Sequence, residues 1–312
     1  MKTLISRRHA LAVSVAALGA TAAKTAPRTK MTIQLSAGAI GVKANQQQAL
    51  DYAHRFGFES VDADSAFLAA LDDSALKRFL DDMRAKNVAW GQAGMPVEFR
   101  KDEETFRKGL ADLPARAKAL QRAGVTRVTT WIPPTSDDLT YLENLKLHVR
   151  RLREVASILG DHGCRFGLEY VGPKTLWTSR RYAFVHSMRE MKELIADIGK
   201  PNMGFVLDSW HWFTAGESAA DLKTLANKDV VSIDLNDAPA GLALDKQIDS
   251  SRELPCATGV IDVAAFLNAL NSIGCDAPAR CEPFNAPLRQ MPPDQALEAT
   301  IAAMRKAFAL IQ

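Results

Sequence analysis

The chain has 312 residues, of which 47% are apolar and 24% are charged, and its formal net charge is +3. This size fits one large domain or two small ones. The near balance of charge argues against nucleic acid or an acidic membrane as the main partner, because both require a strongly basic face.

The first residues predict an export signal. The run from Ser6 to Leu11 contains Arg7-Arg8 and resembles a twin-arginine motif, and an uncharged, alanine-rich run follows. That run is too short to cross a bilayer comfortably, so a signal peptide is favoured over a membrane anchor or a frayed terminus. We therefore expect residues 1–23 to be an export signal and 24–30 a linker, with the mature protein periplasmic or secreted. Removing the signal would leave equal numbers of basic and acidic residues.

From residue 31 onward, short apolar runs alternate with stretches of helical period. The runs that predict strands are Thr32–Ser36, Glu59–Ala63, Val88–Gly91, Arg127–Ile132, Arg165–Tyr170, Gly204–Asp208, Val230–Leu235 and Ala279–Glu282. The stretches that predict helices are Gln46–Phe56, Asp73–Lys86, Glu104–Ala123, Leu139–Leu159, Met188–Ile198, Ala219–Ala226, Val263–Ile273 and Pro293–Leu310. Eight alternating pairs predict a single-domain (β/α)8 TIM barrel over residues 31–312. An open doubly wound sheet is the alternative, but the first turn does not complete a GxGxxG motif.

Four successive strands each place one acid at the C-terminal end. The acids are Glu169, Asp208, Asp234 and Glu282. Active sites of TIM barrels lie at this end of the strands, so the four side chains are expected to share one cavity. Their mutual repulsion would force protonation unless a cation is present, and all-oxygen ligation favours a hard or borderline divalent ion. Four independent ion pairs with nearby Arg and Lys residues are the alternative.

Aromatic and polar residues also lie at the predicted mouth of the barrel. His211 follows Asp208 closely and is flanked by Trp210 and Trp212, an arrangement suited to a sugar, whose C–H faces stack on rings while its hydroxyls form hydrogen bonds. Trp131 falls at another strand end and could equally pack in the core. His211, Trp210 and Trp131 are therefore candidate substrate contacts.

The segment from Asn236 to Gly259 is the longest connection, and it leaves the same face after the seventh strand. Its length suits a lid over the substrate. Asp237 and Arg252 are its candidate substrate-binding residues, because a guanidinium is a rigid fork suited to vicinal hydroxyls or an enediolate oxygen. A solvated loop in which Arg252 pairs with Asp249 is the alternative.

At these residues the chain resembles the xylose-isomerase-like barrel superfamily of sugar isomerases, ketose 3-epimerases, inosose dehydratases and endonuclease-IV-type enzymes. The motifs that carry the resemblance are Gly167-Leu168-Glu169, Leu207-Asp208-Ser209-Trp210-His211, Ile233-Asp234-Leu235-Asn236-Asp237 and Cys281-Glu282-Pro283. Glu169, Asp208 and Glu282 match three metal ligands of the epimerase branch, and Asp234 stands where that branch usually has a histidine. The resemblance implies one bound metal ion, and the all-oxygen ligands favour Mn, Mg or Co, with Zn as a further option. It also implies Glu169 and Glu282 as the acid–base pair and His211 as a substrate contact that helps to polarise the carbonyl. These three are the candidate catalytic residues.

The expected function is a divalent-metal-dependent isomerase or epimerase. It would act on an unphosphorylated keto-sugar or cyclitol by removing a proton next to a carbonyl group. A lyase or dehydratase on a keto-sugar, keto-glycoside or keto-inositol begins with the same proton abstraction and is the first alternative. A non-catalytic sugar-binding barrel is the second. The expected partner is a small molecule, with neither nucleic acid nor a stable membrane association.

Overall fold

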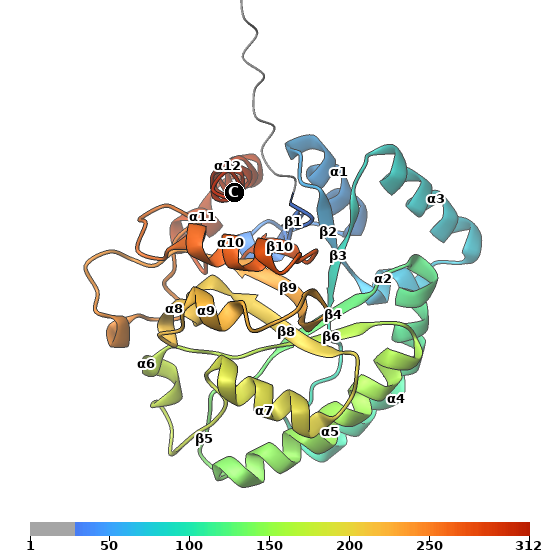
Figure 1. The fold of residues 1–312 in the computed structure, drawn as a ribbon. Helices are drawn as coiled ribbons and strands as arrows, with labels where there is room; N and C mark the ends of the chain where they lie inside the picture. Colours follow the sequence, from blue (N-terminus) through green and yellow to red (C-terminus); the bar gives the residue numbers. More distant parts are fainter. Residues whose placement is uncertain (1–28) are drawn as a thin grey trace, which may run out of the picture.

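The computed structural model describes residues 29–312, in which eight parallel strands close into a barrel (Figure 1). The strands are β1 (Thr32–Leu35), β2 (Ser60–Ala63), β3 (Ala89–Gly94), β4 (Arg127–Trp131), β6 (Arg165–Glu169), β8 (Met203–Asp208), β9 (Val230–Leu235) and β10 (Pro278–Cys281). They follow one another around the barrel in chain order, and β10 pairs with β1 to close it. The predicted (β/α)8 barrel is confirmed.

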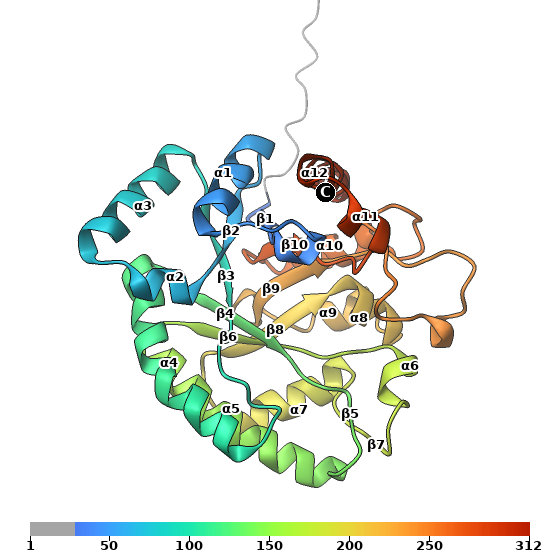
Figure 2. The ribbon, with the colours of Figure 1, turned by 180° about the vertical axis from the view of Figure 1, so that it is seen from behind.

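The helices surround the strands, as Figure 2 shows from behind. Those that match predicted stretches are α1 (Gln46–Phe56), α3 (Asp73–Ala85), α4 (Glu103–Ala123), α5 (Tyr141–Asp161), α7 (Met188–Ile198), α9 (Ala219–Leu222), α10 (Val263–Ser272) and α12 (Pro293–Phe308). Additional short elements are α2 (Ser65–Ala70), α6 (Lys174–Trp177), α8 (Ser209–Thr214), α11 (Ala286–Gln290) and an antiparallel pair, β5 (Thr135–Ser136) and β7 (Tyr182–Ala183). The helices α2, α6, α8 and α11 each follow the C-terminal end of a strand.

Helix α1 illustrates how local sequence fixes an element. The Asn45 side chain accepts a hydrogen bond from the Gln48 backbone N–H, and the Gln48 side chain accepts one from the Asn45 N–H. This capping box satisfies two backbone donors that an open helix end would leave unpaired. At the other end Gly57 adopts a φ of 77°, the left-handed conformation that ends a helix and returns the chain toward β2.

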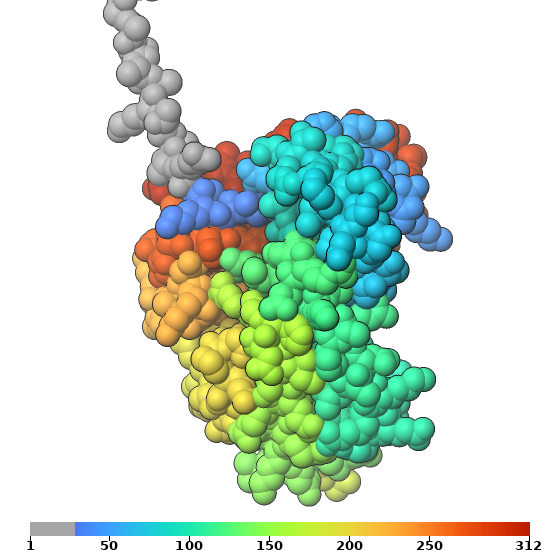
Figure 3. Space-filling model, turned by 90° about the vertical axis from the view of Figure 1, so that its right-hand side faces the viewer, coloured from blue at the N-terminus to red at the C-terminus, as the bar shows by residue number. Residues whose placement is uncertain are grey.

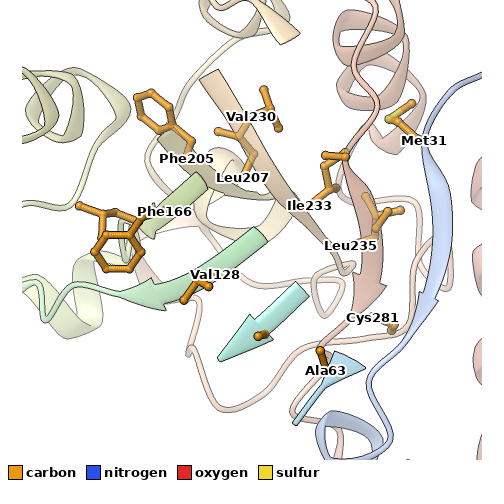
Figure 4. Close-up of a cluster of buried hydrophobic side chains, with 14 of the residues drawn as sticks. Met31, Ala63, Val128, Phe166, Phe205, Leu207, Val230, Ile233, Leu235 and Cys281 are labelled. Carbon is orange, nitrogen blue, oxygen red and sulfur yellow. The ribbon is translucent and has the colours of Figure 1, made fainter. Parts of the chain in front are cut away.

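The apolar core lies between the strands and the surrounding helices. Figure 4 shows Phe166, Leu207 and Ile233 among its buried side chains. Leu207 and Ile233 are register partners, and so are their chain neighbours Asp208 and Asp234. Since side chains alternate along a strand, the apolar pair faces the helices and the acidic pair faces the barrel interior. Strand alternation thus carries the acids into the barrel.

The first and last parts of the described chain lie together. Strand β1 pairs with β10, and the blue N-terminal residues border the orange and red C-terminal region in Figure 3. The expected export signal, residues 1–23, lies outside the described residues. Within 29–312, no helix is both long enough and apolar enough to cross a membrane.

Candidate functional site

The structure brings the four predicted acids together at the C-terminal end of the barrel. Glu169 ends β6, Asp208 ends β8, Asp234 lies on β9 and Glu282 follows β10. One carboxylate oxygen of each lies within 4.8 Å of one from every other. Glu169, Asp208 and Asp234 are buried, and Glu282 is partly buried. We refer to these four residues as the acid cluster.

Asp208 is the most completely hydrogen-bonded member. Its Oδ1 accepts from the Trp210 backbone N–H at 2.7 Å and from the Asn236 amide at 3.0 Å. Its Oδ2 accepts from Arg252 Nη1 at 2.7 Å. Burial raises the pKa of Asp208 to about 7, although the positive charge of Arg252 opposes that rise. Asp208 therefore depends on Arg252 to stay ionised.

Asp234 is held by an arginine that the sequence reasoning missed. Arg280, two residues before Glu282 on β10, donates from Nε and Nη2 to the two Asp234 oxygens at 2.7 and 2.8 Å. Its Nη2 also donates to Glu282 Oε1 at 3.1 Å. With its amide oxygen turned toward Arg280, Gln92 accepts from the guanidinium at 3.1 and 3.2 Å. The sequence did contain a signal for Arg280. It stands two positions before Glu282, and residues two apart on a strand face the same side.

Glu169 differs from the other three acids. Its Oε1 is inaccessible to water and has no hydrogen-bond partner among the described residues. Burial, together with the charges of Asp234, Glu282 and Asp208, holds the pKa of Glu169 well above its ordinary value. An unpaired carboxylate oxygen beside three other carboxylates is a position that a bare cation could satisfy.

The donor set fits a divalent ion. Glu169, Asp208 and Glu282 offer hard oxygen ligands, while both Asp234 oxygens are already engaged by Arg280. His211 also comes within reach of Glu169 and Asp208. Within residues 29–312, the four carboxylates face two guanidinium groups, those of Arg252 and Arg280, so negative charge remains in excess.

His211 lies in α8 and is buried at the edge of the acid cluster. The Gly172 backbone N–H donates to its Nδ1 at 3.2 Å. A side chain at position 172 would collide with the His211 carbonyl oxygen, so only glycine permits this approach. Burial and the nearby charge of Arg252 hold the pKa of His211 well below its ordinary value. His211 is therefore a neutral hydrogen-bonding group.

Arg252 is buried within the site and is not a residue of a solvated loop. Its side chain is 1% exposed, and besides Asp208 it pairs with Asp249 at 2.6 Å. The Phe284 ring lies 4.5 Å from its guanidinium carbon, with a left-handed φ of 42° that is unusual for an aromatic residue. The predicted pairing with Asp249 occurs, but inside the site. The loop after β9 thus delivers a charged group to the acid cluster.

A cavity of about 1250 Å³ opens above the acid cluster. Its lining includes Glu169, His211, Arg252 and Glu282. Trp131, the register partner of Glu169, also lines it and is 46% exposed. Further lining residues that the sequence reasoning missed are Arg100, Asn144, His148, Arg180, Arg280 and Phe284. Arg100 lies over the Trp131 ring, 4.4 Å from its centroid.

Two residues expected to contact the substrate, Trp210 and Asp237, lie outside the lining of the cavity. Trp210 is fully buried and lies beneath Arg252, at 5.5 Å from its guanidinium carbon to the ring centroid. Asp237 is also fully buried, and its carboxylate accepts hydrogen bonds from the backbone N–H groups of Thr258, Gly259 and Ile261. Neither residue lines the cavity within the described part of the chain. In this structure Trp210 supports Arg252 and Asp237 anchors the long loop. Direct contact of either side chain with the substrate stays a prediction.

Comparison with known proteins assigns the fold to a family. A family model described as a xylose isomerase-like TIM barrel matches residues 50–307. A curated relative, inosose isomerase from Bacillus velezensis, is 22% identical over 275 residues, which cover 85% of this chain and 94% of the relative.

Solved structures show the same fold. A xylose isomerase domain protein from Alicyclobacillus acidocaldarius superposes with a TM-score of 0.77 at 29% identity, covering 90% of this chain and 98% of the other. The IOLI protein with a bound zinc atom gives 0.73 at 20% identity, with coverage of 89% and 98%. The 3-keto-D-glucoside 4-epimerase YcjR from E. coli, in its apo form, gives 0.65 at 16% identity, with coverage of 89% and 100%.

Proposed function

The chain belongs to the xylose isomerase-like TIM barrel family, and we propose that it is a divalent-metal-dependent isomerase or epimerase of a keto-sugar or cyclitol. The observation that carries this proposal is the acid cluster beneath a large cavity, with the buried Glu169 Oε1 left without a partner. Relatives named inosose isomerase and a structural neighbour named as a keto-glucoside epimerase support the same class of reaction.

The chemistry is proton removal from a carbon next to a carbonyl group. Glu169, Asp208 and Glu282 would hold the ion, and a bound divalent ion would polarise the carbonyl oxygen of the substrate. Arg252 and neutral His211 line the same cavity and would donate hydrogen bonds to oxygens that gain negative charge. These donors are already positioned in the structure, so little reorganisation is required when charge develops.

Glu169 and Glu282 are suited to complementary proton-transfer roles. Burial raises the pKa of Glu282, but Arg280 and Arg252 lie beside it and oppose that rise, which suits Glu282 to removing a proton. Glu169 has no such hydrogen-bonded partner, and where no ion is bound its pKa is held well above the ordinary value. A bound cation would favour its ionised form, so that Glu169 could receive a proton from the substrate and return it. Two carboxyl groups with environments that separate their pKa values are the pattern expected of an acid–base pair.

A neutral, ring-shaped substrate suits the lining of the cavity. Exposed Trp131 offers a face for the C–H groups of a sugar or cyclitol. The cavity volume of about 1250 Å³ also leaves room for a keto-glycoside, which is the observation that favours a lyase as the second candidate. A lyase would use the same proton abstraction and then expel the group on the adjacent carbon.

Solvent exchange distinguishes these functions. Purified protein with MnCl2 should be incubated in D2O with unphosphorylated keto-sugars, inososes and keto-glycosides, and followed by NMR. Deuterium in an isomerised product supports the proposal, whereas an elimination product identifies a lyase. Binding without deuterium uptake identifies a sugar-binding barrel. Glu169→Gln should abolish exchange, and Glu104→Gln, at an exposed position on α4, should leave it unchanged.

We further propose that the protein is exported. The motivation is the pair Arg7-Arg8 ahead of an uncharged run. Replacing both arginines with lysine should retain the precursor in the cytoplasm, as measured by fractionation. Unchanged export of that variant would refute a twin-arginine signal.

A further inference from the structure

We infer that Arg280 is a built-in cation of the acid cluster, which competes with the divalent metal for Asp234 and Glu282 and thereby weakens metal binding. This inference rests on the metal site of the proposed function. It concerns a residue of the barrel interior to which neither the family resemblance nor the relatives assign a role.

The contacts of Arg280 place its charge inside the cluster. Nε and Nη2 engage both oxygens of Asp234, a residue with no exposed surface, at 2.7 and 2.8 Å. Nη2 bridges to Glu282 Oε1 at 3.1 Å. One guanidinium therefore neutralises Asp234 and also contacts a second member of the cluster, Glu282.

The guanidinium is fixed in this position by strand register. Arg280 and Asp234 are register partners on β10 and β9, so their side chains face the interior at the same height. Gln92 on β3 contacts the guanidinium from across the barrel. Partners on two other strands, β9 and β3, keep the side chain from swinging out to make way for a metal ion.

A fixed guanidinium has two opposing effects on the cluster. It offsets repulsion among the carboxylates, so the barrel can fold with no metal bound. The same positive charge repels a divalent ion a few ångströms away and occupies oxygen lone pairs that the ion would use. Arg252 does not duplicate this role, because it engages Asp208 from the loop side. We therefore expect weak, exchangeable metal binding with Asp234 left to Arg280.

The test compares two variants that both lack the Asp234 charge. Asp234→Asn leaves the charge of Arg280 in the cluster with Glu282 as its remaining ion-pair partner. Asp234→Asn/Arg280→Met removes both charges of the Asp234–Arg280 pair. Mn²⁺ affinity is measured by calorimetry, and the rise of melting temperature with added MnCl2 gives a second readout. We expect the double variant to bind Mn²⁺ roughly tenfold or more tightly than the single variant, since only the guanidinium differs.

A matched pair elsewhere in the barrel provides the control. Arg127 on β4 pairs with Asp276 at 2.9 Å, away from the acid cluster. Asp276→Asn and Asp276→Asn/Arg127→Met should bind Mn²⁺ equally. Equal affinities in the two Asp234 variants, or weaker binding by the double variant, would overturn the role of Arg280. Wild-type protein that binds no divalent ion would instead refute the metal site, and with it the inference, whereas lack of deuterium exchange would refute only the proposed reaction.

Discussion

Replacing Arg252 with alanine should destabilise the metal-free protein by about 3–5 kcal/mol, the usual cost of removing one partner of a buried ion pair. The side chain is 1% exposed, and its Nη1 lies 2.7 Å from Asp208 Oδ2, so solvent screens this contact very little. Without Arg252, Asp208 keeps its hydrogen bonds from Asn236 and Trp210 but loses the ion pair at 2.7 Å. The packing of the guanidinium on Phe284 is lost as well.

The size of this loss should depend on pH and on metal. Burial already raises the pKa of Asp208 to about 7, and losing Arg252 raises it further. An acid whose pKa is higher in the folded than in the unfolded state contributes stability at pH values below its unfolded pKa. This contribution is lost as pH rises through the folded pKa, so the variant should be destabilised more at pH 8 than at pH 5.5. Added MnCl2 should recover part of the loss by supplying positive charge.

Urea unfolding in EDTA at both pH values, and at pH 8 with MnCl2, measures these effects. Arg55→Ala is the control, because Arg55 pairs with Asp294 at an exposed site where such pairs contribute less than about 1 kcal/mol. A cost for Arg252→Ala as small as that of the control, with no dependence on pH, would refute the reasoning.

Three further outcomes are expected. Glu169→Gln should reduce solvent exchange by about 100-fold or more while retaining the fold, because it removes an acid–base group and a buried repulsive charge; exchange within twofold of wild type would remove Glu169 from the mechanism. Trp131→Ala should raise KM by roughly 2- to 10-fold through lost ring stacking, with an unchanged melting temperature because the side chain is 46% exposed; a large fall in melting temperature would make it structural. Burial lowers the pKa of His148 to about 4, so the unfolded chain takes up the proton first and stability should fall by up to about 3 kcal/mol as pH drops from about 6.5 to 4. His148→Phe, which keeps the contacts with Phe99 and Phe184, should flatten that slope in urea titrations; parallel pH curves would contradict it.

The barrel could be predicted because its strands are buried and its helices are long and amphipathic. The short rim elements could not. Helix α8 consists of Ser-Trp-His-Trp-Phe-Thr, a run without strong helix formers, and it begins where the Asp208 side chain accepts from the Trp210 N–H. Strands β5 and β7 have two residues each and depend on their mutual pairing. Such elements are fixed by tertiary contacts that sequence periodicity does not reveal.

The acid cluster was predictable for a related reason, because parallel strands end at a common face and alternation fixes which side chains turn inward. Proximity in sequence was a poor guide beyond the strand ends. Trp210 and His211 are adjacent but lie about 100° apart on α8, so one ring supports Arg252 while the other lines the cavity. Asp237 comes three residues after Asp234, yet its carboxylate accepts hydrogen bonds from backbone N–H groups of the long loop and does not reach the cavity.

Arg280 and Asp234 are best understood as one linked feature of this chain. The family resemblance implies a histidine at position 234, which would bring no negative charge to the cluster. An aspartate there adds a buried charge, and that charge requires a partner at the same height in the barrel. The strand register supplies it, since residue 280 is the neighbour of residue 234 across β9 and β10. On this reasoning, barrels of the family that carry aspartate at the position of Asp234 should carry arginine or lysine at the position of Arg280. Barrels with histidine at the position of Asp234 should have no basic residue at the position of Arg280. An aspartate that stands without such a neighbour would show that the metal itself balances the charge.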